Sequence, residues 1–183
     1  MTSTEATTEM RKRGIYRRIT LRRADGQVYL NRWGLSHDRI GGILLHRMDA
    51  PDPGLDLHDH PWWFVSIILW GGYTEERADI AQASARAARA DQLDGGVGLH
   101  NAGVRGTTVK RRWLSVRTMR QDECHTITEL HGPTSWSLVI KGPRLRSWGF
   151  YPPEGYMPAA RYAAERAERR QLYLVRSYHK SGA

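Results

Sequence analysis

Short apolar runs alternate with clusters of glycine, proline and aspartate along much of the chain. Three such runs fall within residues 15–48, and Asp25-Gly26 and Gly41-Gly42 separate them. Apolar runs of this length, bounded by turn-forming residues, are typical of β-strands. The pattern therefore predicts strands joined by turns in the N-terminal part of the chain.

The same pattern returns further along the chain. The segment WWFVSIILW (residues 62–70) is continuously apolar, is too short for a typical helix, and is followed by Gly71-Gly72. These features predict a buried strand. We expect further strands over 112–119, 125–130 and 136–140.

Two segments have the composition of helices instead. Residues 78–94 are rich in Ala, Arg and Gln but carry only a weak apolar stripe, and residues 158–176 are Ala-rich and highly charged. We expect a surface helix or an irregular excursion in the first segment and a helix on the outside of the domain in the second. Residues 1–10 are polar and unpatterned, which predicts a flexible tail.

Composition narrows the classes of protein to consider. The 183 residues fit one domain, and no apolar run is long enough to cross a bilayer. The single Cys124 cannot close an intrachain disulfide, and the N-terminal residues lack the apolar segment of a secretory signal, so we expect a cytoplasmic protein. A net charge of +9, with seven basic and no acidic residues between Arg11 and Arg23, leaves nucleic acid open as a partner.

His58 and His60 are the most informative pair for chemistry. Residues two apart on a strand project from the same face, so both imidazoles can bind one metal ion while Asp59 points away. The pair lies at the end of a loop rich in Pro, Asp and Gly, and His125 begins a later strand, whereas His46 occurs in no motif. Three imidazoles suit Fe, Zn, Ni, Cu or Mn to different degrees, so they predict a divalent metal without naming it.

The segment around these histidines resembles the first sequence motif of the cupin superfamily, the RmlC-like jelly-roll barrels. Gly54, His58, His60 and Gly71-Gly72 fit the frame of this motif within a residue or two, and His125 fits the histidine of the second motif. The segment WSLVIKGPRLRSWGFYPPEGY is similar to the closing part of a cupin-like subgroup found in bacteria and phages. The resemblance covers roughly residues 40–76 and 112–157.

The resemblance implies an all-β, single-domain cupin double-stranded β-helix with a C-terminal helix and one inserted helix or loop. The barrel would span residues 11–157 with its insertion at 78–105, and residues 158–183 would form the C-terminal helix and tail. Cupins often pair through their N-terminal edge strands, so the resemblance also implies a homodimer.

The usual fourth ligand of cupins, a glutamate, is missing here, because Phe64 or Val65 stands at its position. Glu75 or Glu76 is an alternative fourth ligand. A three-histidine site is similar to that of thiol dioxygenases and diketone-cleaving oxygenases, which implies an Fe(II)-dependent dioxygenase-type oxidoreductase acting on a small organic substrate. The alternatives are a metal-dependent isomerase or lyase, and a non-catalytic cupin that binds a metal or small ligand for regulation or storage.

Basic side chains near His125 are candidates for binding the substrate. Arg117, Arg120 and Lys141 fall on or beside the strands that would flank this histidine. An inward-facing guanidinium can hold a carboxylate through two hydrogen bonds.

Aromatic side chains complete the set of candidates. We expect most tryptophans to fill the barrel interior, and Trp136 is the candidate for contacting a flat or apolar part of the substrate. Tyr73 and Tyr151 are candidate catalytic groups that donate a proton or orient a bound oxygen.

Overall fold

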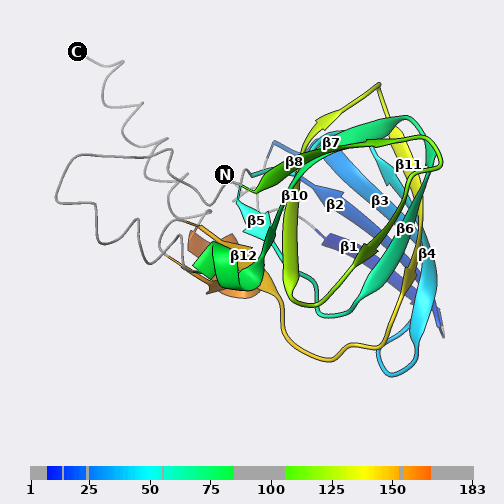
Figure 1. Cartoon of the computed structure of the whole chain (residues 1–183). Coiled ribbons are helices and arrows are strands. Elements are labelled where there is room, and N and C mark those ends of the chain that lie inside the picture. Colours follow the sequence, from blue (N-terminus) through cyan, green and yellow to red (C-terminus); the bar gives the residue numbers. More distant parts are fainter. Residues whose placement is uncertain are drawn as a thin grey trace, which may run out of the picture.

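Two antiparallel sheets face each other in the computed structural model and form the wall of a barrel (Figure 1). The structure describes residues 8–13, 15–23, 25–54, 56–84, 106–152 and 155–165. The all-β class and the jelly-roll arrangement predicted from the sequence are confirmed.

The larger sheet contains, in spatial order, β1 (Thr8–Arg13), β2 (Tyr16–Arg22), β3 (Val28–His37), β4 (Gly41–Met48), β11 (Ser135–Lys141), β6 (Phe64–Trp70) and β9 (Val116–Met119). The late strand β11 inserts between β4 and β6 and pairs with both, so that Ser137 lies opposite His46 on one side and Ile68 on the other. This insertion brings segments that are distant in sequence side by side.

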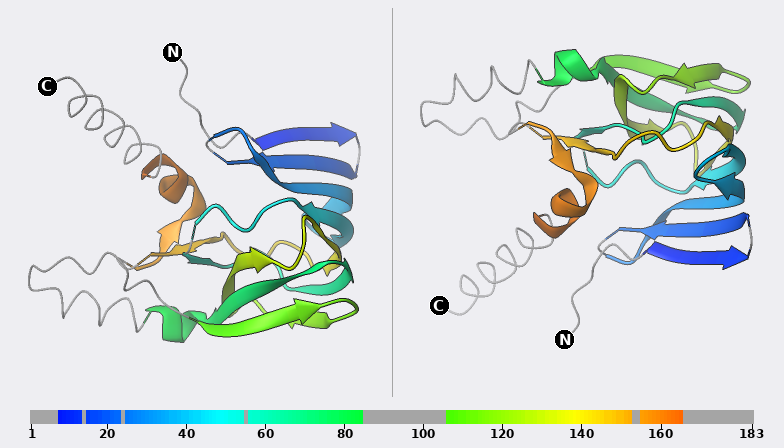
Figure 2. Two further views of the ribbon diagram at one scale, coloured as in Figure 1. Left: turned by 90° about the horizontal axis from the view of Figure 1, so that it is seen from above. Right: turned by 90° about the horizontal axis from the view of Figure 1, so that it is seen from below.

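The smaller sheet contains, in spatial order, β13 (Met157–Pro158), β12 (Gly149–Tyr151), β5 (Leu57–His58), β10 (Glu123–Leu130), β7 (Gly72–Asp79) and β8 (Thr107–Arg112). Figure 2 shows the blue strands β1 to β3 on one side of the molecule and the green strands β7 and β8 on the other. The two-residue strand β5 pairs with both β10 and β12, which fixes the chain just before His60 within the sheet.

Side chains alternate between the two faces of each strand, and this divides the core into layers. Two clusters of buried apolar side chains lie between the sheets, one around Ile68 and Tyr73 and the other around Phe64 and Val139. A third cluster, which includes Cys124, packs on the opposite face of the smaller sheet. The inner layer therefore surrounds the face of β10 that carries His125, while Cys124 points away from it.

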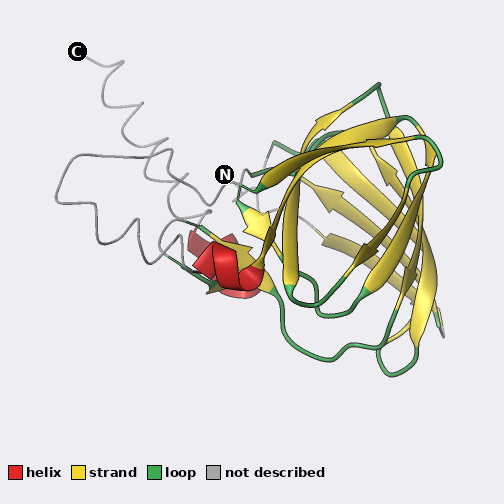
Figure 3. Ribbon diagram, viewed as in Figure 1, coloured by secondary structure: helices red, strands yellow, loops and turns green. Residues whose placement is uncertain are grey.

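Two short helices lie outside the barrel wall (Figure 3). The first occupies residues 80–84 and the second residues 159–165, so each matches the start of a helix expected from composition. Residues 85–105 of the predicted insertion and residues 166–183 of the C-terminal segment lie outside the described residues. Neither helix, within the part of the chain that is described, is long and apolar enough to cross a membrane.

Four local expectations need correction. The strand predicted over 112–119 is two strands, because Leu114 adopts a left-handed conformation (φ 58°) at a turn that carries the chain from the smaller to the larger sheet. Gly41-Gly42 open β4 instead of forming the preceding turn. The strand at 64–70 is buried on one face only, and Thr8–Met10, expected in the tail, pair with β2 as part of β1.

Candidate metal centre

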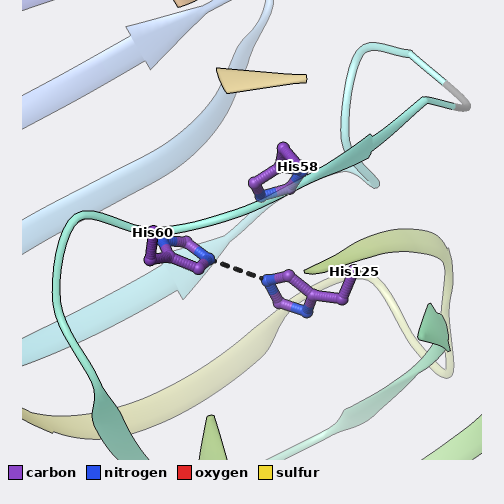
Figure 4. A group of neighbouring side chains, drawn as sticks. All are labelled: His58, His60 and His125. Carbon is purple, nitrogen blue, oxygen red and sulfur yellow. Dashed lines mark hydrogen bonds between the residues drawn. The ribbon is translucent and has the colours of Figure 1, made fainter. Parts of the chain in front are cut away.

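Three imidazoles converge between the sheets (Figure 4). His58 lies on β5, His60 in the loop that follows it, and His125 on β10. One ring nitrogen from each lies within 4.8 Å of the other two, and the Nε2 atoms of His60 and His125 are 3.0 Å apart. The expectation that these three histidines come together is confirmed.

Strand register explains this convergence. His125 on β10 is the direct cross-strand partner of His58 on β5. Such partners have Cβ atoms about 4.5–5.5 Å apart and share one face of the sheet. His60 returns to the same face two residues after His58, as the HxH spacing predicts.

Asp59 points away from the other two members of the HxH segment and anchors it. Its side chain is fully buried, and Oδ1 accepts a hydrogen bond from the Gly149 N–H (2.7 Å). Oδ2 accepts hydrogen bonds from Arg146 (2.5 Å) and from the Tyr151 hydroxyl (3.0 Å). These bonds tie the histidine segment to β12 and the loop before it.

Glu75 fixes the orientation of His125. Its Oε2 lies 2.9 Å from Nδ1 of His125 and 2.6 Å from Nη1 of Arg117. Burial would raise the pKa of this carboxyl, but the hydrogen bond from His125 and the charge of Arg117 outweigh burial, and the pKa is lowered. The ionised carboxylate can only accept, so Nδ1 of His125 donates, and in the neutral ring Nε2 carries the lone pair that faces Nε2 of His60.

Glu75 and Glu76 therefore differ in their relation to the site. Glu75 contacts the Nδ1 side of His125, away from the nitrogen that faces His60, and is not part of the group of converging ligand atoms. Glu76 is the next residue on β7 and so faces the opposite side of the sheet. Glu75 supports a ligand instead of adding one.

The donor set fits a divalent transition metal. Burial lowers the pKa of His58 to about 4, and burial together with the neighbouring His125 lowers that of His60 well below its usual value. Both rings are therefore neutral at pH 7, which is the form that binds metals. Two nitrogen ligands each ~2.1 Å from an ion and at right angles to one another are ~3.0 Å apart, which matches the separation of Nε2 in His60 and His125.

The three histidines face a cavity of about 80 Å³ between the sheets. Most of its wall is apolar, and Phe64, Ile127 and Val139 are examples. Its polar lining, besides the three histidines, consists of Arg32, His46, Asp52, Ser66, Tyr73 and Ser137. The space accommodates a small molecule beside the histidines.

Arg32 and His46 are cavity residues that the sequence interpretation missed. His46 lies between Leu44 and Met48, which also face the cavity, so the two-residue period of this strand was the available signal. Arg32 alternates with Leu30 in the same way, but apolar residues on both faces of β3 hide this period.

Two residues expected to bind the substrate lie away from the cavity. The Arg120 side chain is 73% exposed and pairs with Asp122, because it lies at the turn after β9. Trp136 faces the outer surface of the larger sheet, where it stacks on Trp33 with ring centroids 6.0 Å apart. Its neighbour Ser137 takes the inward position on β11.

Only one of the other candidates lines the cavity. Tyr73 lines the cavity, whereas the Tyr151 hydroxyl is bound to Asp59 on the far side of the HxH segment. Arg117 is buried beside Glu75, and the ammonium of Lys141 lies 4.0 Å from the Trp62 ring centroid.

Tryptophan does not fill the barrel as expected. Trp70 and Trp113 are 68% and 66% exposed, and Trp63 is also exposed. These residues stand at the ends of strands or on turns, where the ring projects outward. The interior is closed mainly by aliphatic side chains, methionines, Phe64 and Tyr73.

No protein-family model and no curated protein matches the chain. Among solved structures, the crystal structure of Fe(II) HppE is 12% identical, with a TM-score of 0.46, over 75% of this chain and 65% of that one. A structure of the DMSP lyases RdDddP and RnDddQII is 12% identical, with a TM-score of 0.38, over 62% of this chain and 47% of that one. The capsular polysaccharide assembling protein CapF from Staphylococcus aureus is 7% identical, with a TM-score of 0.39, over 75% of this chain and 31% of that one.

The match to each of these proteins spans less than two thirds of its length. The similarity to a bacterial and phage subgroup stays a prediction. Two antiparallel sheets closed into a jelly-roll barrel, with an HxH segment and a third histidine converging between them, identify the chain as a cupin-fold protein.

Proposed function

We propose that this protein is a mononuclear metal-dependent cupin enzyme in which His58, His60 and His125 bind Fe(II). The proposed activity is that of a dioxygenase-type oxidoreductase acting on a small organic substrate. The observation that carries the proposal is the convergence of three imidazole nitrogens within 4.8 Å of one another at the wall of a cavity between the sheets.

Three neutral ligands leave a divalent ion with its full charge and with open coordination positions. Such an ion would supply a centre at which a substrate heteroatom and dioxygen are held in contact. The set lacks a carboxylate ligand, which is the feature that favours the three-histidine oxygenase chemistry over other cupin activities.

The chain's own residues prepare this site. Glu75 holds the proton on Nδ1 of His125 and keeps Nε2 available. Burial, with the nearby Glu75 carboxylate, raises the pKa of Tyr73, so its hydroxyl stays protonated and can donate a hydrogen bond into the cavity. Arg117 and Asp59 act through the histidines as positioning residues.

Metal analysis and oxygen consumption together test the proposal. We expect one Fe(II) per chain after anaerobic reconstitution, loss of the metal in His125→Ala, and retention in the control His131→Ala. His131 is a suitable control because it bonds Thr74 (2.9 Å) instead of facing the cavity.

The same experiment distinguishes the alternatives. Oxygen uptake with a small acid or thiol supports the dioxygenase. Turnover without oxygen uptake would indicate an isomerase or lyase, and stoichiometric metal without any turnover would indicate a binding protein. A preference for Zn, Ni, Cu or Mn in a competitive reconstitution would replace iron in the proposal. Failure of every one of these metals to bind would refute the metal centre itself.

Homodimer formation and a cytoplasmic location remain predictions, and light scattering tests the first. Association with nucleic acid also remains a prediction, and three arginines of the basic segment donate to main-chain oxygens. Arg17 bonds Ser36, Arg22 bonds Gly26, and Arg23 bonds Pro51. Undetectable binding of random DNA and RNA at low salt would exclude it.

A further inference from the structure

A row of polar side chains crosses the cavity wall that faces the three histidines. The register of the larger sheet places Arg32 on β3 opposite His46 on β4, and His46 opposite Ser137 on β11. All three line the cavity. The adjacent inward rows are apolar and contain Leu30 and Met48 on one side and Leu44 and Val139 on the other.

Two polar atoms on this wall have no hydrogen-bond partner among the described residues. Nε of Arg32 and Nε2 of His46 are buried without a hydrogen bond. Ser66 lies on β6 opposite Val139, at the edge of the same cavity. A buried polar group without a partner costs about 1–3 kcal/mol. Two such groups on one cavity wall indicate a ligand that brings its own oxygen acceptors.

The charge of the wall indicates what kind of ligand it accepts. Arg32 is the only Arg or Lys among the described residues that line the cavity. Burial, with Arg32 nearby, lowers the pKa of His46 well below its usual value, so His46 offers a hydrogen bond but no charge. The one carboxylate in the lining, Asp52, already accepts the Ile127 N–H (2.8 Å). A single guanidinium matches a monoanion better than a dianion.

We propose that Arg32, His46, Ser66 and Ser137 form a subsite for the carboxylate of a small monocarboxylic acid, with the other end of the acid directed at the three histidines. The guanidinium presents two parallel N–H donors to a carboxylate, and the hydroxyls and the imidazole complete its hydrogen bonds. The cavity volume of about 80 Å³ restricts the acid to a short chain. This inference rests on the proposed function for the role of the histidines and names its substrate class.

Calorimetric titration of the full-length, metal-free protein tests the subsite directly. The probes are propionate, its neutral analogue propionamide, and inorganic phosphate. We expect propionate to bind, propionamide to bind at least about tenfold more weakly, and Arg32→Met to weaken propionate binding by at least about tenfold, as loss of charge-assisted hydrogen bonds requires. The control Arg120→Met removes an exposed guanidinium and should leave the affinity unchanged.

Two further variants keep the test valid if Arg32→Met does not fold. Arg32→Lys preserves the charge but loses the two-pronged geometry, and Ser137→Ala removes one hydroxyl from a small buried side chain. Each should weaken propionate binding severalfold while circular dichroism stays native. Equal propionate affinity in wild type and these variants, absence of propionate binding, or tighter binding of phosphate than of propionate would overturn the subsite.

The metal content of the same variants separates this inference from the proposed function. Arg32→Met should retain the metal stoichiometry of the wild type after reconstitution, because Arg32 is not among the converging ligands. Propionate binding that depends on Arg32, in a protein that takes up no metal, would refute the proposed function but support the subsite. Stoichiometric metal binding, together with propionate binding that does not depend on Arg32, would refute the subsite but not the proposed function.

Discussion

Replacing Glu75 with glutamine separates the two tasks of the buried Glu75–Arg117–His125 group. The carboxylate accepts from Nδ1 of His125 at 2.9 Å and pairs with Arg117 at 2.6 Å, and the Glu75 and Arg117 side chains are only 1% and 4% exposed. Glutamine keeps the shape of the side chain but removes its charge. Arg117 is then a buried cation without a counter-ion, and His125 loses a charge-assisted hydrogen bond.

The two losses have different magnitudes and different readouts. Breaking a buried ion pair by changing one partner costs about 3–5 kcal/mol of unfolding free energy. Loss of the carboxylate behind a metal-bound histidine lowers metal affinity about 10- to 100-fold. We expect Glu75→Gln to show both effects, measured by urea unfolding of the metal-free protein and by competitive metal titration.

A second variant assigns each effect to its contact. Arg117→Met, combined with Glu75→Gln, removes the uncompensated cation and should recover most of the lost stability without recovering metal affinity. Glu76→Gln, one residue along β7 and on its other face, is the matched control and should change neither quantity. Wild-type metal affinity in Glu75→Gln would refute the role of the carboxylate in orienting His125.

Three more predictions follow from the same contacts. The unfolding free energy of the metal-free protein should fall by up to about 3 kcal/mol as the pH falls from 6.5 to 4. The reason is that the unfolded state binds a proton at His58 that the folded state, with a pKa of about 4, does not bind. An unfolding free energy that is the same in urea titrations at pH 7, 5.5 and 4.5 would contradict this. Asp59→Asn should lower the unfolding free energy by about 1–3 kcal/mol and weaken metal binding, since the ion pair with Arg146 is lost. The control Asp79→Asn, at an exposed residue, should change neither quantity. Tyr73→Phe should reduce turnover about 100-fold or more at unchanged metal content; wild-type turnover would rule out a proton-donating role.

Local spacing was enough to predict the metal ligands. The HxH segment places two imidazoles on one face whatever the surrounding fold, and His125 stands at the start of a strand with a clear apolar pattern. The turn at Gly71-Gly72 and the strands on either side of it were also recognisable, because Gly71 takes a positive φ of 69° there. These features depend only on residues close in sequence.

The cationic side of the cavity could not be predicted in the same way. The larger sheet carries apolar residues on its outer face as well, with Leu35, Ile43 and Ile140 exposed, so alternation did not show which face of β3 and β4 was inward. Proximity to His125 in the sequence points to Arg117 and Arg120 instead. Arg32 reaches the cavity only through the pairing of β3 with β4, which depends on contacts distant in the chain.

X-ray absorption spectroscopy of the Fe(II)-reconstituted protein tests the metal centre most directly. The outer-shell scattering of imidazole rings counts the histidines bound to the ion. One iron per chain with three imidazoles, reduced to two in a His58→Ala variant that retains iron, is the result expected from the converging rings of His58, His60 and His125. An iron surrounded by fewer than three imidazoles in the wild type, or a spectrum that stays the same when any of the three histidines is replaced, would contradict the assignment.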